Sequence, residues 1–206
     1  MYFDDQAKNW DNDPGKIERA QVFAKEITNV VKPDGNMKGF EYGCGTGLLS
    51  YYLRNHFSDL VLADNSEGML SVLKERIEKE KITNMIPVHV NLPDDNFKQH
   101  DFDVIYTLMT LHHIKETNEL IHTFNTILKK GGYLCIGDLV TEDGSFHANM
   151  HDFDGHNGFD RNELESVLRN NGFEIKSYTI CYEITKNTND GRTKQYPLFL
   201  LVGKKS

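Results

Sequence analysis

The feature that most constrains this chain of 206 residues is the segment 40–47, which reads FEYGCGTG. An apolar, strand-like lead-in runs into three glycines at alternate positions, and a helix-like run begins at Leu48. Strand, glycine turn and helix in this order are how α/β folds bring backbone close to a nucleotide-like ligand. Glycine suits such a turn because it adopts positive φ without a Cβ clash and leaves no side chain between backbone and ligand. A glycine-rich turn without a ligand is the alternative interpretation.

The spacing of the glycines separates two classes of ligand. The dinucleotide fingerprint is G-x-G-x-x-G, which places a diphosphate at a helix N-terminus. Here the pattern is acid-x-G-x-G-x-G, with Glu41 two residues before Gly43. A carboxylate at that point would repel a diphosphate, but it suits a ligand that carries an amino group and a sulfonium. A dinucleotide-dependent oxidoreductase is therefore the less favoured function.

The segment resembles the first motif of class I S-adenosylmethionine-dependent methyltransferases, of the type that acts on small molecules. The resemblance implies an α/β fold: a doubly wound, Rossmann-like sheet of seven mostly parallel strands with a reversed last strand. It implies S-adenosylmethionine as the cofactor, with the glycine loop around its methionine half and the acid near its amino group. On this basis the predicted cofactor-binding residues are Glu41, Gly43, Cys44, Gly45, Gly47, Asp64, Asn65, Met69, Asn91, Leu92 and Leu108.

Asp64 ends a short apolar run, 60–63, of the kind found in strands that are buried on both faces. An acid at the end of the second strand can accept two hydrogen bonds from ribose hydroxyls. Residues 64–70 read DNSEGML and resemble the family's D-x-S-x-x-M-L segment, in which the methionine region packs near the adenine. The alternatives are that Asp64 is a helix cap and that Met69 belongs to the core.

The end of the third predicted strand, 86–90, departs from the family pattern. Where the family usually has an acid that accepts from the adenine amino group, this chain has Asn91, followed by Leu92. The carbonyl oxygen of asparagine can still accept a hydrogen bond. Asp94 and Asp95 are nearby alternatives.

A fourth predicted strand, 102–106, leads to residues 111–114, which read LHHI. This resembles a segment at the edge of the cofactor and substrate pockets in many small-molecule methyltransferases. Metal-binding pairs on one helix face lie at i and i+4, whereas neighbouring side chains point in different directions. Ordinary packing or capping is therefore the preferred interpretation of His112 and His113.

The polar stretch 138–158 is the longest loop after a predicted strand, and such loops carry function in open α/β sheets. His147 and His151 are four residues apart and would share a face on a helical turn, so a metal site there is one reading. A solvated loop with hydrogen-bonded histidines is the preferred one, and no metal is predicted. No catalytic residue is assigned. If the acceptor is a hydroxyl, a base is more useful, and these two histidines join His112 and His113 as candidates.

Length and composition predict a single domain over 1–206, with an N-terminal helical cap over 1–35 and an α/β core over 36–206. Trp10 in the cap is either a packing residue or part of a lid over the cofactor. Thr117 is expected to cap a helix that Gly131 and the next glycine bring to an end. Two closing strands, 173–180 and 196–202, are joined by a polar turn and must be antiparallel.

The remaining features bear on partners and location. Net charge is -8 with no long basic cluster, so nucleic acid is not an expected partner. No Asn/Asp-Pro-Pro-Tyr signature follows the fourth strand, unlike in methyltransferases of DNA-base amines.

Three cysteines without a C-x-x-C pair suit a reduced, cytoplasmic chain. The acidic start is not a signal peptide, and the longest apolar run, 198–202, is too short to span a membrane. A small-molecule acceptor is expected, the oligomeric state is not indicated, and a cofactor-binding sensor without transferase activity is an open alternative.

Overall fold

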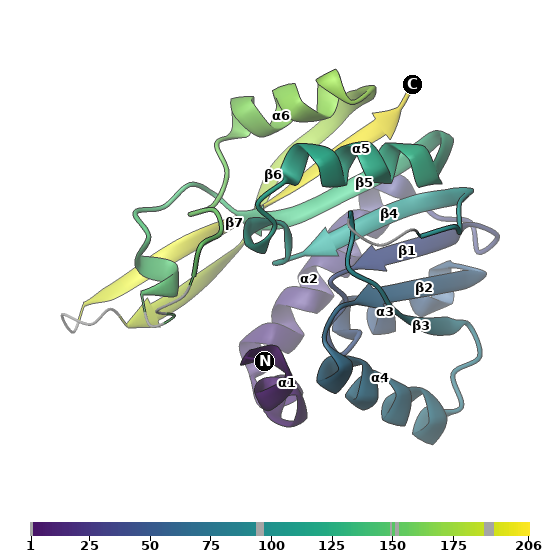
Figure 1. Ribbon diagram of the computed structural model, residues 1–206, viewed down its shortest axis with the longest axis horizontal. Helices are drawn as coiled ribbons and strands as arrows, with labels where there is room; N and C mark the ends of the chain where they lie inside the picture. Colours follow the sequence, from purple (N-terminus) through teal and green to yellow (C-terminus); the bar gives the residue numbers. More distant parts are fainter. Residues whose placement is uncertain (1, 94–96, 149, 151–152, 188–191) are drawn as a thin grey trace.

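The computed structural model describes residues 2–93, 97–148, 150, 153–187 and 192–206. Its centre is one seven-stranded sheet (Figure 1). In chain order the strands are β1 (Lys38–Tyr42), β2 (Asp59–Asp64), β3 (Met85–His89), β4 (Phe102–Leu108), β5 (Leu128–Leu139), β6 (Phe173–Asn187) and β7 (Thr193–Lys205).

The strand order across the sheet is β3-β2-β1-β4-β5-β7-β6. β1 pairs in parallel with β2 and β4, and the pairs β2–β3 and β4–β5 are also parallel. β7 runs antiparallel to both of its neighbours, β5 and β6. The predicted doubly wound sheet with a reversed last strand is therefore confirmed. The direction of winding changes between β1 and β4, and ligands of such sheets bind at the carboxyl ends of the strands at that point.

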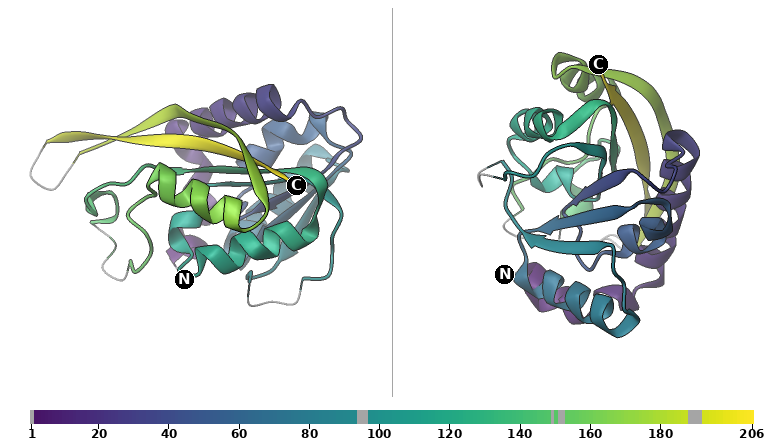
Figure 2. Two further views of the ribbon diagram at one scale, coloured as in Figure 1. Left: turned by 90° about the horizontal axis from the view of Figure 1, so that it is seen from above. Right: turned by 90° about the vertical axis from the view of Figure 1, so that its right-hand side faces the viewer.

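Helices cover both faces of the sheet (Figure 2). The first cluster of buried apolar residues joins α2, α3 and α4 to one face, and the second joins α5 and α6 to the other. Among the described residues, no helix has both the length and the apolar character needed to cross a membrane. The helices are α1 (Tyr2–Gln6), η1 (Ala7–Asn12), α2 (Pro14–Val31), α3 (Leu48–Leu53), η2 (Arg54–His56), α4 (Glu67–Glu80), η3 (Leu111–His113), α5 (Thr117–Ile127), η4 (Ser145–His147) and α6 (Arg161–Asn170).

The start of α2 follows the sequence signals, whereas α5 departs from them at both ends. Asp13 caps α2 by accepting a hydrogen bond of 2.9 Å from the Gly15 backbone N–H. Thr117 does not cap α5: it is the first helical residue, and its hydroxyl donates to the Ile114 carbonyl at 3.0 Å. At the other end the backbone is already extended at Leu128, which pairs with β4, so Gly131 lies within β5 and does not stop the helix.

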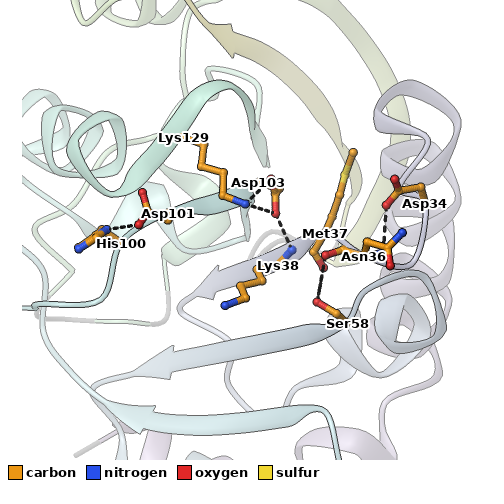
Figure 3. Close-up of polar contacts among 9 residues, drawn as sticks. All are labelled: Asp34, Asn36, Met37, Lys38, Ser58, His100, Asp101, Asp103 and Lys129. Atoms are coloured by element: carbon orange, nitrogen blue, oxygen red, sulfur yellow. Dashed lines mark hydrogen bonds and ion pairs between the residues drawn. The ribbon is translucent and has the colours of Figure 1, made fainter.

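Polar contacts close the amino end of the central strands (Figure 3). The Asp103 carboxylate accepts hydrogen bonds of 2.8 Å from the Lys38 backbone N–H and from the Lys129 ammonium group. These contacts tie β1, β4 and β5 together at their amino ends, whereas the glycine loop follows the carboxyl end of β1. Hydrogen bonds and an ion pair therefore join the strands at the amino end of the sheet. The glycine loop lies at the opposite, carboxyl end.

The hairpin of β6 and β7 extends well beyond the rest of the sheet (Figure 2). The connection between β5 and α6 packs against this extension. The Lys186 ammonium group donates to the Phe146 carbonyl at 2.9 Å, and the Tyr196 and Ser145 hydroxyls lie 2.8 Å apart. These contacts place η4, and with it His147, at the carboxyl end of the sheet.

Candidate functional site

A cavity of about 590 Å³ lies at the carboxyl ends of the central strands. Its walls come from the N-terminal helices, the glycine loop, the ends of β2 and β4, η3 and the connection after β5. Of the predicted cofactor-binding residues, those on its walls are Glu41, Gly43, Cys44, Gly45, Asp64, Asn65, Met69 and Leu108.

The remaining three predicted residues are not among those that line the cavity. Gly47 is the residue before α3. A Cβ there would come within 2.6 Å of the Leu73 side chain, so a glycine at this position allows α3 and α4 to pack closely. Asn91 contacts the cavity residue Asn65, whose amide nitrogen donates to its carbonyl oxygen at 3.3 Å. Leu92 is 2% exposed and packs in the core, so its side chain offers no surface to the cavity. The alternatives Asp94 and Asp95 fall outside the described residues.

Gly45 is the glycine of the loop that faces open space. Its φ is +53°, which a residue with a Cβ rarely adopts. A Cβ at Gly45 would have only Met69 Sδ and Trp10 Nε1 near it, at 3.9 and 4.0 Å. At Gly43, by contrast, a Cβ would collide with the side chain of Thr110. Gly43 therefore allows the segments after β1 and β4 to lie close together, while Gly45 leaves its own part of the cavity wall without a side chain.

Asp64 holds the glycine loop in place. One carboxylate oxygen accepts a hydrogen bond of 2.7 Å from the Gly45 backbone N–H, and the other accepts one of 2.9 Å from the Ser66 backbone N–H. Burial raises the pKa of Asp64, and these hydrogen bonds oppose that rise. A third backbone N–H, that of Asn65, also interacts with this carboxylate. Because each carboxylate oxygen has two lone pairs, Asp64 keeps one acceptor position for a ligand.

Glu41 is buried beneath the loop at 3% exposure. Its carboxylate accepts from the hydroxyl and, at 3.3 Å, from the backbone N–H of Ser50, and that hydroxyl lies 2.6 Å from the Tyr106 hydroxyl. Burial raises the pKa of Glu41 to about 8 despite the hydrogen bonds from Ser50. The side chain is therefore largely protonated at pH 7 in the absence of a cation.

We expect the stability of the protein to fall with rising pH because of Glu41. The side chain is ionised above its ordinary pKa of 4.5 in the unfolded chain but only above about 8 in the folded one. Its contribution to stability is full below pH 4.5 and declines up to about pH 8, by at most about 1.4 kcal/mol per pH unit. Chemical denaturation of Glu41→Gln between pH 5 and 9 should show this slope removed, whereas the exposed control Glu116→Gln should keep it. An unchanged slope in Glu41→Gln would contradict the assignment.

The N-terminal segment is fastened to the glycine loop and to α4 by two acids. Asp11 accepts a hydrogen bond of 2.6 Å from the Thr46 hydroxyl and pairs with Arg76. Asp4 accepts from the Ser66 hydroxyl at 2.6 Å and from the Gly68 backbone N–H at 2.9 Å. Neither contact could be predicted from the sequence, in which the aromatic residues were the most prominent feature of this segment. They place Trp10 on the cavity wall.

Three histidines meet at the wall of the cavity. The nitrogens that His112, His113 and His147 can offer all lie within 4.8 Å of one another. His112 is buried, and its Nδ1 lies 2.6 Å from the carboxylate of Asp138, which is also buried. The ring of His147 stacks on Phe153, with the ring centroids 3.8 Å apart.

The preferred sequence interpretation of the loop after β5 was wrong for His147. That residue was expected in a solvated loop, but it is 8% exposed, because η4 turns its side chain inward against Phe146 and Phe153. Its expected partner His151 lies outside the described residues. Burial together with the neighbouring imidazoles lowers the pKa of His147 to about 3 and that of His113 to about 4. Both rings are therefore neutral at pH 7.

Three cations also line the cavity: Lys16 and Arg19 from α2, and Lys186 from β6. Lys16 Nζ lies 3.4 Å from the centre of the Trp10 ring, and Lys186 Nζ lies equally close to that of Phe146. Sequence reasoning missed them because each looks like an ordinary surface residue. The available signal was that Lys16 and Arg19 are three apart and so share a helix face.

Comparison with known proteins places the chain in a family. A family model for a methyltransferase domain matches residues 16–178. An uncharacterized methyltransferase of Schizosaccharomyces pombe is 30% identical over 132 residues, 61% of this chain and 46% of that protein. The ubiquinone biosynthesis O-methyltransferase of Coxiella burnetii is 26% identical over 138 residues, 64% of this chain and 57% of that protein. This chain thus spans about half the length of these curated relatives.

Solved structures share the fold at low sequence identity. An S-adenosylmethionine-dependent methyltransferase from Mesorhizobium loti has a TM-score of 0.67 at 15% identity, over 88% of this chain and 96% of that one. Phosphoethanolamine N-methyltransferase 2 of Haemonchus contortus, solved with S-adenosylmethionine, has a TM-score of 0.69 at 18% identity, over 88% of this chain and 52% of that one. With the family match over most of its length, this chain belongs to the methyltransferase domain family, in the class I S-adenosylmethionine-dependent fold.

Proposed function

We propose that this chain binds S-adenosylmethionine at the glycine loop and transfers its methyl group to a small-molecule acceptor held beside the histidines of the same cavity. The observation that carries the proposal is the composition of the cavity wall. The wall presents the loop around Gly45 with Asp64 and Met69, and it also presents His112, His113 and three cations. One cavity could therefore hold both a cofactor and an acceptor.

The residues at the loop fit the methionine half of the cofactor. Gly45 leaves a space that a Cβ would fill, Asp64 has a lone pair for a hydroxyl group, and Glu41 is a buried acid beneath the loop. A cofactor amino group near Glu41 would favour its ionised form, since an opposite charge lowers the pKa of a buried carboxyl. When bound, S-adenosylmethionine supplies an electrophilic methyl group for in-line displacement at its sulfonium.

The chain's contribution to such a displacement is alignment of the two reactants and exclusion of water, both of which give large rate effects. The N-terminal helices suit this task. Tyr2, Phe3 and Trp10 line the cavity, and Asp4 and Asp11 hold the segment against the loop and α4. We therefore assign residues 1–35 as a cap over the cofactor and 36–206 as the α/β core of one domain.

The charges in the cavity indicate the acceptor class. The cavity is lined by the cations Lys16, Arg19 and Lys186 and by the acids Asp13, Glu41 and Asp64, of which Asp64 is assigned to the cofactor and Glu41 is largely protonated. The three cations favour an acceptor with a carboxylate or phosphate group, because opposite charges attract strongly where water is excluded. The relatives do not set the acceptor atom, since one is named as an O-methyltransferase and another, from Arabidopsis thaliana, as a phosphoethanolamine N-methyltransferase.

Calorimetric titration with S-adenosylhomocysteine, the product form of the cofactor, tests the proposal. We expect micromolar binding, of order -8 kcal/mol, and a change in the fluorescence of Trp10, the only tryptophan in the chain. NADH, the comparison ligand, should produce neither signal. Absence of S-adenosylhomocysteine binding, or tighter binding of NADH, would overturn the cofactor assignment. Binding without methyl transfer to any member of a panel of acidic acceptors would favour the sensor alternative.

A further inference from the structure

The side chains of His112, His113 and His147 come together from two separate parts of the chain. The first two belong to η3, directly after β4, and the third belongs to η4, after β5. Their ring centroids are 4.1 to 5.4 Å apart, and the nitrogens that they can offer lie within 4.8 Å of one another. Histidines that meet only by packing have no need to bring their nitrogens this close together.

We infer that His112, His113 and His147 form a binding site for a divalent transition metal ion of the zinc class. Zinc binds histidine nitrogen at about 2.0 to 2.1 Å, so the nitrogens of a tetrahedral site lie about 3.4 Å apart. The nitrogens therefore need to approach one another by at most about 1.4 Å around an ion. Imidazole is a preferred ligand of zinc, copper, iron and nickel, whereas magnesium and calcium prefer oxygen.

Asp138 supplies the outer contact that metal-binding histidines usually have. Its carboxylate lies 2.6 Å from His112 Nδ1 and also accepts from the backbone N–H groups of His112 and Leu139, at 3.2 and 2.7 Å. An N–H at Nδ1 that donates to this carboxylate leaves Nε2 of His112 as the free ligand atom. A carboxylate behind the ring fixes its orientation and makes it a stronger ligand. At His147 the charge of Asp138 opposes that of Lys186.

His147 provides an independent observation. Its Nδ1 is buried and has no hydrogen-bond partner among the residues that the structure describes. Buried ring nitrogens are ordinarily paired, so an unpaired one calls for a ligand. The ring cannot readily turn away to find water, because it lies parallel to Phe153 with an interplanar angle of 10°.

Three protein ligands leave a position open, which is the arrangement of metal sites that bind substrate or water. His112, His113 and His147 all line the cavity, so this position faces the space assigned to the acceptor. An oxygen of the acceptor bound there would be polarised and oriented. This last step rests on the proposed function; the metal site itself does not.

The test is metal binding by protein that carries no histidine tag. After removal of metal with a chelator, we expect calorimetry to show one equivalent of Zn²⁺ bound, and Co²⁺ to give the visible absorption of a tetrahedral site. His147→Ala and the less buried His113→Ala should each weaken Zn²⁺ binding at least about 100-fold. Asp138→Asn should weaken it by about 10- to 100-fold, the usual effect of an outer contact. The exposed control His122→Ala should bind as the wild type does.

Circular dichroism and thermal unfolding show which variants are folded. If His147→Ala is not folded, the Zn²⁺ affinity of folded His113→Ala tests the metal site. A wild type that takes up no stoichiometric Zn²⁺, or ligand variants that bind as tightly as His122→Ala, overturn the inference. Titration of S-adenosylhomocysteine into the same wild-type protein keeps the two claims apart. Cofactor binding without metal removes only the metal site, and metal binding without cofactor removes only the proposed function.

Discussion

Gly45→Ala is expected to weaken binding of S-adenosylhomocysteine at least about 100-fold, or about 2.7 kcal/mol. The methyl group would enter the cavity between the loop, Met69 and Trp10, where the protein itself leaves 3.9 to 4.0 Å of room. The folded protein can therefore accommodate the new Cβ, but a ligand lying against the backbone of the loop cannot. Calorimetric titration of the variant measures the loss directly.

Gly35→Ala is the matched control for this variant. Gly35 also has a positive φ, +82°, and a Cβ there has no atom within 4 Å. Both substitutions carry the same kind of backbone strain, about 1 kcal/mol, but only Gly45 faces the cavity. Equal binding by the two variants would show that the loop does not contact the ligand, and the cofactor assignment would have to be abandoned.

Phe23→Ala should lower the free energy of unfolding by about 3 to 5 kcal/mol, the usual loss for a fully buried phenylalanine. Phe23 is completely buried on α2 and packs on β5, where a Cβ at Gly137 would come within 2.5 Å of its ring. The same helix carries Lys16 and Arg19 to the cavity. Denaturant unfolding gives the loss, and the exposed Ile180→Ala, which removes a side chain of 47% exposure, should cost less than about 1 kcal/mol.

A double-mutant cycle makes the Phe23 prediction specific to the contact with β5. Gly137→Ala alone should destabilise by about 1 to 3 kcal/mol, because the new methyl group overpacks against Phe23 and, at 2.9 Å, against Leu108. In Phe23→Ala/Gly137→Ala the methyl group enters space that the ring has left. The double variant should therefore lose less than the sum of the single losses, by at least about 0.5 kcal/mol. Strict additivity would mean that α2 does not pack on β5 at this point.

Much of the fold could be predicted because its signals are local. The short apolar runs and the closing pair of strands indicated individual strands, and the resemblance carried by the alternating glycines implied the sheet with its reversed strand, which the structure has. The ends of α5 could not be predicted, because pairing between β4 and β5 draws Leu128 into an extended conformation. Backbone hydrogen bonding to a neighbouring strand is a tertiary effect that outweighs the local preference of glycine for helix ends.

Some residues of the candidate site could also be predicted from the sequence, and others could not. Gly45 and Asp64 could be assigned in advance, because a turn that needs positive φ and an acid at a strand end are visible as residue types at fixed spacing. The grouping of His112 with His147 could not, since 34 residues of chain separate them and their side chains meet only after η4 has turned inward. Spacing instead favoured His147 with His151, because sequence shows only neighbours along the chain.

The sequence by itself determined the glycine loop and the place of an acid at the end of the second strand, since both are visible as residue types at close spacing, and the family resemblance of that loop predicted the seven-stranded sheet. The tertiary structure alone decided which charges reach the cavity, which acids fasten the N-terminal helices and which histidines share a wall. The physical reason is that these contacts join segments far apart in sequence, and packing of the two helical layers on the sheet sets their distances.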